Sequence, residues 1–410
     1  MAPRIMHLFP PRKTSFAAKD YNPPNATGLR GVGMRITGVE VIRSEIPLSD
    51  GGVRPAWAPG TLSKSWPCSV VKITTEEGLV GVGAQKYWNP TLIDIIKRVL
   101  VEEIHDPVYV GRFSERMDSL RNNYGDRFCA FEVALWDLIG KEAGKPIYQL
   151  LGACQDRVLA YASTAELREP KERARNAVDL LEQGFKAVKL RFHDPKPEKD
   201  LAIVKAVRES VSDSMEIIVD ANQSRRLHSG IDEPRWSLKT ATKIAGELEK
   251  LDALWLEEPL PAIDLEGLAT LREKTDIMIA GGEAEYGVAP FRDYLKAESL
   301  DILQPDVQYG GGILVAKKIA AIAEASNKLC IPHTWGAGLI MAADLQLIGS
   351  LSNCPYVEYP FEPPGWTVEA RDSILEEPIG IDSDGYVNIP RGPGLGVKLN
   401  EEALEKYRID

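Results

Sequence analysis

Short apolar runs that end in an acidic side chain recur in the second half of the chain. Leu254-Trp255-Leu256 precedes Glu257, Ile217-Ile218-Val219 precedes Asp220, and Met278-Ile279-Ala280 precedes two glycines and Glu283. Runs of this length bounded by polar residues are typical of buried strands that step out into a loop. The intervals between them leave room for one strand, one helix and two loops each time. We therefore expect three acids at corresponding ends of three successive strands.

Strand and helix patterns alternate from Val158 onward, which favours βαβ units and a parallel sheet. Lys171 to Gln183 predicts a helix closed by Gly184, and 187–192 predicts the strand after it. Further strand ends fall at Asp220, Glu257, Glu283, Pro305-Asp306, Ile331-Pro332-His333 and Val357-Glu358. Together with 158–162, these strands number eight, which favours a closed (β/α)8 barrel over an open doubly wound sheet. A dinucleotide-binding fold loses its main support because no G-x-G-x-x-G follows the first strand.

The residues before this alternation predict a separate α+β domain. Strands are expected at 36–42, 70–74 and 79–83, and helices at 92–104 and 129–143. The Gly- and Pro-rich stretch 49–66, with Trp57 and Trp66, is predicted to be a loop. The predicted limits are 1–33 for an N-terminal extension, 34–152 for this domain, 153–360 for the barrel, and 361–410 for a segment returning to the first domain.

Composition narrows the class of protein. The 410 residues are 44% hydrophobic and 27% charged, the ordinary balance of a globular chain. The net charge of -11 argues against a general nucleic-acid or membrane surface. In addition, no apolar run approaches the ~20 residues needed to span a bilayer. We expect no nucleic-acid partner and no membrane association.

The five cysteines are scattered and form no C-x-x-C pair, so free thiols in a reducing compartment, the cytoplasm, are expected. A cysteine-based zinc site is disfavoured for the same reason. Residues 1–33 carry five basic side chains and Asp20 as their one acid, a bias that resembles a weak organellar transit peptide. Pro10-Pro11 and Pro23-Pro24 would interrupt an amphipathic helix, so an arm-like extension is the alternative.

In a barrel of this kind the carboxyl ends of the strands form one face, where distant side chains converge. That face is expected to hold Lys189, Arg191, Asp220, Glu257, Glu283, Asp306, His333 and Glu358. Three carboxylates without cysteine or clustered histidine are hard oxygen ligands suited to Mg²⁺. The alternative is that each acid merely caps the helix that follows it.

The order of these motifs resembles the enolase superfamily, in its mandelate racemase branch. The resemblance runs from Met34 almost to the end. It rests on Val188-Lys189-Leu190-Arg191, Val219-Asp220-Ala221-Asn222-Gln223, Trp255-Leu256-Glu257-Glu258-Pro259, Gly282-Glu283, Gln304-Pro305-Asp306 with Gly310-Gly311-Gly312, Pro332-His333 and Val357-Glu358. It implies an α+β cap, completed by the C-terminal segment, over a modified (β/α)8 barrel. It also implies a homo-oligomer, between a dimer and an octamer.

The resemblance further implies a role for each residue. Asp220, Glu257 and Glu283 would ligate Mg²⁺, His333 would be the general base oriented by Asp306, and Lys189 and Glu358 would bind the substrate carboxylate. Further substrate contacts are expected from Arg191, Asn222, His193, Trp57 and Trp335. Mg²⁺ and hydrogen-bond donors would stabilise the enediolate that forms when the α-proton leaves.

Arg191 departs from the pattern of racemising members, which carry a second lysine as a base at this position. Arginine stays protonated at neutral pH and cannot act as a base. A one-sided reaction remains, in which His333 removes the α-proton and then helps the β-hydroxyl leave. The predicted function is therefore the dehydration of an aldonate or aldarate to a 2-keto-3-deoxy acid by a hydro-lyase. A cycloisomerase, an epimerase or racemase, and a catalytically silent enolase-like protein are the alternatives.

Three further segments carry predictions. The long link 225–236, with Arg225 and Arg226, is either a lid that adds positive charge for a distal anion or an ordinary solvated loop. Loop 49–66 and residues 86–88 are expected to close over the barrel mouth, although their aromatic residues could instead pack domain on domain. Strand alternation points only one of Glu257 and Glu258 at the metal, and the resemblance selects Glu257.

Overall fold

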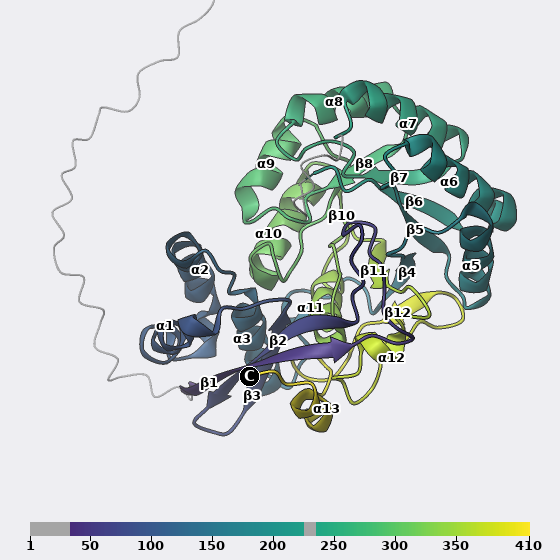
Figure 1. Cartoon of the computed structure of the whole chain (residues 1–410). Coiled ribbons are helices and arrows are strands. Elements are labelled where there is room, and N and C mark those ends of the chain that lie inside the picture. Colours follow the sequence, from purple (N-terminus) through teal and green to yellow (C-terminus); the bar gives the residue numbers. More distant parts are fainter. Residues whose placement is uncertain (1–32, 225–234) are drawn as a thin grey trace, which may run out of the picture. The chain divides into compact units, whose positions relative to one another are not determined.

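The computed structural model describes residues 33–224 and 235–410 (Figure 1). Met34–Asp410 forms one compact unit, distinct from Met1–Gly33. The predicted extension therefore lies outside the described residues except for Gly33, and the predicted lid lies outside them except for Arg235 and Trp236.

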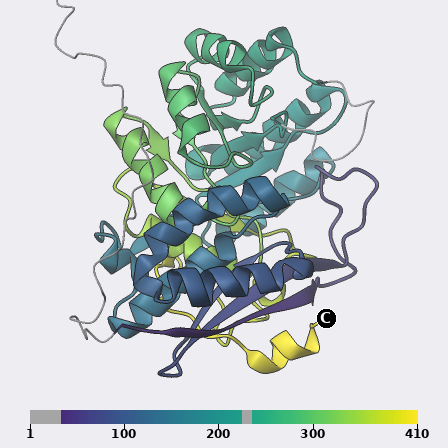
Figure 2. The same cartoon turned by 90° about the vertical axis from the view of Figure 1, so that its left-hand side faces the viewer.

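The N-terminal part is an antiparallel sheet covered by helices. Its strands β1 (Ile36–Pro47), β2 (Ser65–Thr75) and β3 (Val80–Gln85) pair in chain order. Its helices are α1 (Ile93–Arg98), continued by a π-helical turn (Val99–Ile104), α2 (Val110–Tyr124) and α3 (Cys129–Glu142). Figure 2 shows two of these helices, in blue, lying along the purple strands. All three strands run past the predicted limits: β1 continues to Pro47 and β3 to Gln85, and β2 begins at Ser65 and so takes in Trp66, which we expected in the loop.

Helix α3 is apolar around most of its circumference because it lies between two cores. Ala134 and Leu138 belong to the core of the cap, whereas Val133 belongs to the core that continues into the barrel. Strand β3 comes very close to this helix. A Cβ atom at Gly81 or Gly83 would lie 2.2 or 2.1 Å from a backbone oxygen of α3, so glycine is required at both positions.

The barrel has the predicted alternation of strand and helix. Its parallel strands are β4 (Arg157–Ser163), β5 (Ala187–Arg191), β6 (Glu216–Asp220), β7 (Ala253–Glu257), β8 (Met278–Gly281), β9 (Ile302–Leu303), β10 (Leu329–Cys330) and β11 (Tyr356–Pro360). These strands alternate with helices α5 (Pro170–Glu182), α6 (Pro197–Val211), α7 (Leu238–Lys250), α8 (Leu265–Lys274), α9 (Val288–Lys296), α10 (Gly312–Ala325) and α11 (Gly338–Ile348). Helices α5 to α10 form an outer arc in Figure 1. A short helix, α4 (Ile147–Leu150), precedes β4. The predicted capped (β/α)8 architecture is confirmed.

The register of the parallel ladders places three of the predicted site residues side by side. Arg191 pairs with Asp220 across β5 and β6, and Asp220 pairs with Glu257 across β6 and β7. Among the described residues no ladder joins β10 to β11, the two ends of the strand order. The backbone N–H of Thr334 instead donates to the Glu358 carboxylate over 2.9 Å, which links these two strands near their carboxyl ends.

The C-terminal segment contacts both parts of the molecule. Strand β12 (Tyr386–Asn388) pairs antiparallel with β4, and the short helix α12 (Val368–Arg371) precedes it. Helix α13 (Glu401–Lys406) reaches the cap sheet, where Glu401 forms an ion pair of 2.6 Å with Lys72 of β2. We propose 34–152, 153–360 and 361–410 as the domain limits.

All five cysteines are free. Within the part of the chain that the structure describes, no helix has both the length and the apolarity to cross a bilayer.

Candidate active site

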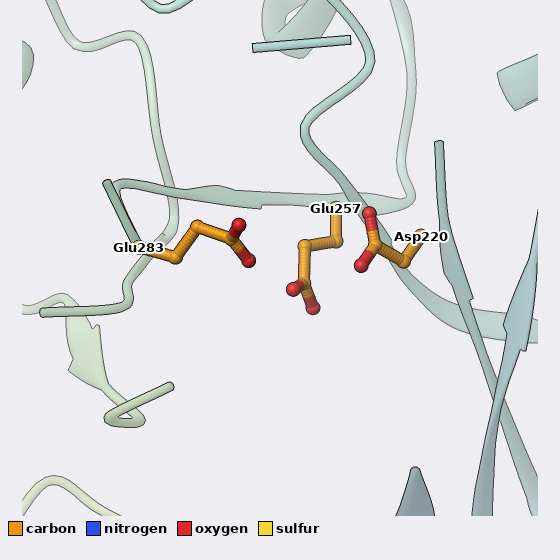
Figure 3. A group of neighbouring side chains, drawn as sticks. All are labelled: Asp220, Glu257 and Glu283. Atoms are coloured by element: carbon orange, nitrogen blue, oxygen red, sulfur yellow. The ribbon is translucent and has the colours of Figure 1, made fainter. Parts of the chain in front are cut away.

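Two buried carboxylates and one half-buried carboxylate meet at the carboxyl ends of neighbouring strands (Figure 3). Asp220 ends β6, Glu257 ends β7, and Glu283 follows β8, and one oxygen from each lies within 4.8 Å of the others. Burial, together with the charge of Glu257, raises the pKa of Asp220 to about 7. A divalent cation would relieve the repulsion among these acids, and an all-oxygen donor set suits a hard ion. The residues present therefore fit the metal that the sequence predicts.

Glu257 is held from several directions. Its carboxylate accepts hydrogen bonds from Lys189 Nζ at 2.9 Å, from Gln304 Nε2 at 2.9 Å and from Trp255 Nε1 at 3.3 Å. Donors on both oxygens restrict the rotation of the carboxylate. This arrangement keeps Glu257 aimed at the other two acids.

Glu258 behaves differently although it is the next residue. Its backbone has a φ of 48°, which takes it out of the regular strand. The side chain is buried, and its Oε1 atom has no hydrogen-bond partner among the described residues. Burial, together with the charges of Glu283 and Asp220, raises the pKa of Glu258 well above its usual value. The two adjacent acids are therefore chemically inequivalent, and only Glu257 belongs to the metal-ligand group.

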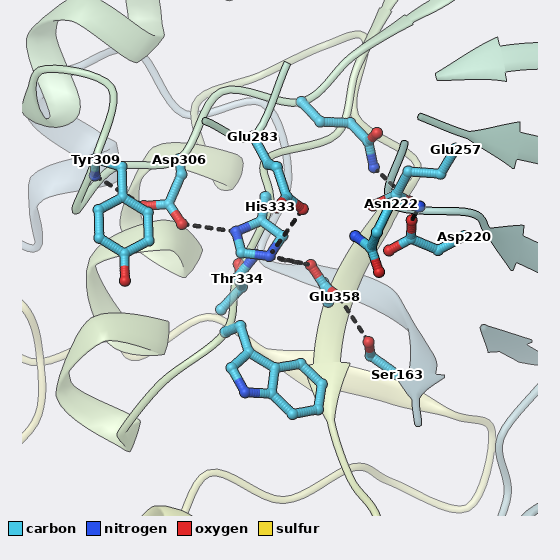
Figure 4. A network of polar contacts seen from close by, with 12 residues as sticks. Ser163, Asp220, Asn222, Glu257, Glu283, Asp306, Tyr309, His333, Thr334 and Glu358 are labelled. Carbon is cyan, nitrogen blue, oxygen red and sulfur yellow. Dashed lines mark hydrogen bonds and ion pairs between the residues drawn. The ribbon is translucent and has the colours of Figure 1, made fainter. Parts of the chain in front are cut away.

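His333 and Asp306 form a dyad next to the acid group (Figure 4). His333 Nδ1 lies 2.7 Å from Asp306 Oδ2, and His333 Nε2 lies 3.4 Å from Glu283 Oε2. The other oxygen of Asp306 accepts the backbone N–H groups of Gln308 and Tyr309 at 2.6 and 3.0 Å. This anchored carboxylate assigns the hydrogen to Nδ1 in neutral His333, which leaves Nε2 as the atom able to accept a proton.

The pKa of His333 is set by opposing effects. Burial alone would lower the pKa of the imidazole, but the nearby charges of Glu283, Glu358 and Asp306 raise it well above its usual value. The histidine is therefore surrounded by carboxylates that stabilise its protonated form.

Lys189 and Glu358 form a fixed ion pair behind the dyad. Lys189 Nζ lies 2.6 Å from Glu358 Oε1 and 3.7 Å from Asp220 Oδ2, and both partners of the 2.6 Å pair are fully buried. Glu358 also accepts a hydrogen bond of 2.6 Å from Ser163 Oγ. Although burial would raise the pKa of Glu358, the charges of Lys189 and His333 outweigh it and lower the pKa to about 2. Both groups thus stay ionised across the physiological range.

A cavity of about 230 Å³ opens in front of these groups. It is lined by Trp57, Trp66 and Lys86 from the cap and by Arg191, Asn222, Glu283, Tyr309, His333 and Trp335 from the barrel. Four of the five predicted substrate contacts line it. The fifth, His193, lies beyond the end of β5, where its Nε2 is 2.8 Å from Asn222 Oδ1, and it lines a neighbouring pocket of about 570 Å³.

Comparison with known families identifies this arrangement. Residues 172–403 match the model described as enolase C-terminal domain-like, and residues 53–152 match the N-terminal domain of mandelate racemase and muconate lactonizing enzyme. The chain belongs to the mandelate racemase/muconate lactonizing enzyme family of the enolase superfamily. The acid group is thus the divalent-metal site typical of an enolase-superfamily enzyme.

Relatives within this superfamily differ in the reaction they catalyse. The chain is 30% identical to arabinonate dehydratase of Saccharolobus solfataricus, over 82% of this chain and 89% of that protein. It is 32% identical to D-galactarolactone cycloisomerase of Agrobacterium fabrum, over 68% and 72%. Among solved structures, 3,6-anhydro-D-galactonate cycloisomerase from Zobellia galactanivorans matches with a TM-score of 0.76 and 27% identity, over 92% of this chain and all of that one.

Arg191 makes a hydrogen bond, an ion pair and two aromatic contacts in this enolase-superfamily site. Its Nε donates to Thr164 O at 2.7 Å, and its guanidinium group forms an ion pair with Asp220. The guanidinium carbon lies 4.7 Å from the ring centroid of Trp57 and 5.4 Å from that of Trp335. Arg191 is therefore a fixed positive group between the cap and the metal ligands, with no capacity to accept a proton.

Trp57 and Trp66 serve both roles that the sequence left open for the aromatic residues of the cap. Trp57 and Trp66 line the cavity, and they also pack edge to face on Trp335 of the barrel with centroid distances of 5.0 and 6.5 Å. Aromatic side chains thus build one wall of the site and join the cap to the barrel.

Sequence reasoning did not mention Tyr309, and it included Lys86 and Trp66 only as parts of the segments 86–88 and 49–66 that were expected to close over the barrel mouth. Lys86 directly follows β3, and Tyr309 falls between Asp306 and the glycines that begin α10. Lys86 and Tyr309 lie close to strand ends and to predicted site residues in the sequence, and this proximity was the feature from which they could have been predicted.

Proposed function

We propose that this enolase-superfamily enzyme dehydrates a sugar acid to a 2-keto-3-deoxy acid, with Mg²⁺ held by Asp220, Glu257 and Glu283. The observation that carries the proposal is the pairing of one competent base, His333, with a permanently charged Arg191 in the same cavity. A two-base racemase needs a second group that can accept a proton, and arginine cannot supply it.

The first step moves one proton. His333 Nε2 takes the hydrogen from the carbon next to the substrate carboxylate, while Asp306 orients the ring and stabilises the imidazolium that forms. Lys189, with Glu358 beside it, would bind the substrate carboxylate and offset the negative charge that develops there. When bound, Mg²⁺ would supply further electrostatic stabilisation of that charge.

The second step releases water. The proton on His333 Nε2 passes to the hydroxyl on the next carbon, the C–O bond breaks, and its electron pair leaves with the water. A C2–C3 double bond forms, and the resulting enol tautomerises to a ketone at C2 with a methylene at C3. One histidine thus serves as base and then as acid, which suits a site with a single proton-accepting group.

A cycloisomerase is the second candidate, and the 32% identity to D-galactarolactone cycloisomerase favours it. Such a reaction shares the first proton transfer, but the leaving group stays within the substrate. Product analysis separates the two, because dehydration releases water whereas cycloisomerisation conserves the mass of the substrate.

The deciding experiment is a screen of aldonates and aldarates with the full chain and Mg²⁺, followed by detection of 2-keto acids. We expect a 2-keto-3-deoxy product from at least one acid. Exchange of the α-hydrogen for deuterium without loss of water would instead indicate epimerisation, and complete inactivity would favour a silent member of the fold. The homo-oligomer implied by the family resemblance stays a prediction.

A further inference from the structure

Lys86 presents a cation to the active-site cavity from the side of the cap. Its Nζ lies 3.9 Å from the ring centroid of Trp66, and both side chains line the cavity that holds His333 and Glu283. The residue is anchored by the barrel, because its backbone N–H donates to Gln308 Oε1 over 3.2 Å. Lys86 is therefore held in place at the junction of cap and barrel.

Gln308 ties this anchor to the catalytic dyad. Its side-chain Nε2 donates to Trp335 O at 3.1 Å and contacts Asp306 Oδ2 at 3.4 Å, and its backbone N–H bonds to Asp306. The position of Lys86 is thus coupled through one side chain to the carboxylate that orients the base. A ligand that reaches both His333 and Lys86 would meet a preformed arrangement.

The charge of Lys86 is not balanced by a neighbouring carboxylate, unlike the charges of Lys189 and Arg191 beside the acid group. Lys189 contacts Glu257 and Glu358, and Arg191 pairs with Asp220. For Lys86, no carboxylate of residues 33–224 or 235–410 lies within 4 Å of Nζ. A partly buried cation loses hydration, and contact with a tryptophan face replaces only part of it. An anion that enters the cavity would supply the partner that Lys86 lacks among the described residues.

We propose that Lys86 binds a second carboxylate of the substrate, so that the preferred substrates are dicarboxylic sugar acids rather than monocarboxylic ones. The inference rests on the proposed function, which places the reacting carboxylate at the metal and Lys189. The far end of a short carbon chain then lies toward the cap, where Lys86 is the cation that faces the cavity. Trp57 and Trp335 are the aromatic walls between these two ends.

The test compares matched acids that differ only in the terminal group. Galactarate with D-galactonate and D-glucarate with D-gluconate are such pairs, and each is measured with the Mg²⁺-loaded full chain, the Lys86→Met variant and the Lys86→Arg variant. We expect the wild-type protein to favour a diacid, and Lys86→Met to lower the diacid-to-monoacid ratio of kcat/KM by roughly 10- to 100-fold, the value of one charged hydrogen bond. Lys86→Arg, which keeps the charge, should retain most of the ratio.

Binding calorimetry with the same acids separates this inference from the proposed reaction. One outcome is that no acid is dehydrated, a diacid still binds more tightly than its monoacid, and Lys86→Met removes that difference in affinity. In that case the role of Lys86 is supported and the proposed dehydration is wrong. Wild-type preference for the monoacids, equal losses for both acids in Lys86→Met, or no binding of any diacid would each overturn the inference. Lys97→Met, an exposed lysine of α1, is the matched control and should leave the ratio unchanged.

Discussion

Asp306 Oδ2 lies 2.7 Å from His333 Nδ1, and the opposite oxygen of Asp306 is tied to two backbone N–H groups. The carboxylate cannot turn away from the ring without losing those bonds. This contact determines which ring nitrogen accepts a proton, and it contributes to the raised pKa of His333.

Replacing Asp306 by Asn should reduce kcat by about 10²- to 10⁴-fold, the range for losing a well-placed acid–base arrangement. Because a negative charge and its hydrogen bond are removed, the pKa of His333 should fall. The acidic limb of the kcat/KM profile should therefore move to lower pH. A rate profile measured across the acidic range checks both effects.

His333→Asn is the matched control for this prediction. It should abolish turnover and leave the thermal midpoint and circular dichroism of the fold unchanged. A residual pH-dependent activity in this variant, or an Asp306→Asn profile that drops without shifting, would contradict the assignment of the base.

The two adjacent acids at the end of β7 should differ in their effect on metal binding. Glu257→Gln removes a ligand, and we expect it to weaken Mg²⁺ binding by at least roughly 10- to 100-fold, the loss seen even for groups behind a ligand. Glu258→Gln should change the affinity much less, because Glu258 lies outside the metal-ligand group and glutamine has nearly the same shape. Titration calorimetry of both variants with Mg²⁺ gives the comparison, and equal losses would mean that Glu258 also serves the metal.

Much of this site could be predicted from the sequence, because residues at the carboxyl ends of successive barrel strands lie next to one another in space. Asp220 and Glu257 end apolar runs, and the parallel register places such ends side by side. The same pattern could not predict the conformation at Glu258, whose positive φ breaks the alternation at the point where the chain leaves the strand.

The cap side of the cavity was harder to predict. Trp66 belongs to β2 rather than to the preceding loop, and Lys86 faces the barrel because a backbone bond to Gln308 fixes the residue where β3 ends. These contacts join residues more than two hundred positions apart. No local pattern of hydrophobic and polar residues encodes them.

A buried ion pair near the end of β11 should matter for stability. Arg173 donates to both oxygens of Glu362 at 3.1 and 2.9 Å, and both side chains are about 2% exposed or less. Arg173→Met leaves part of that buried charge unpaired, so we expect a destabilisation of about 3–5 kcal/mol, read from the urea midpoint. Arg391→Met breaks an exposed pair with Asp156 and should change stability by less than about 1 kcal/mol. Comparable losses in the two variants would refute a special role for the buried pair.

The pH dependence of diacid turnover should report the charge of Lys86. Burial lowers the pKa of Lys86 to about 8, so the amine is protonated below that pH and neutral above it. If the protonated amine binds a substrate carboxylate, kcat/KM for a diacid should fall as the pH rises through about 8. Lys86→Arg should remove this alkaline limb, since arginine keeps its charge.

The other titratable groups that face or adjoin Lys86 are Tyr87, Tyr309, Arg191, His333 and Glu283. The pKa values of Tyr87 and Tyr309 are raised by burial, and neither tyrosine should titrate near pH 8. An unchanged alkaline limb in Lys86→Arg would assign it to a different group.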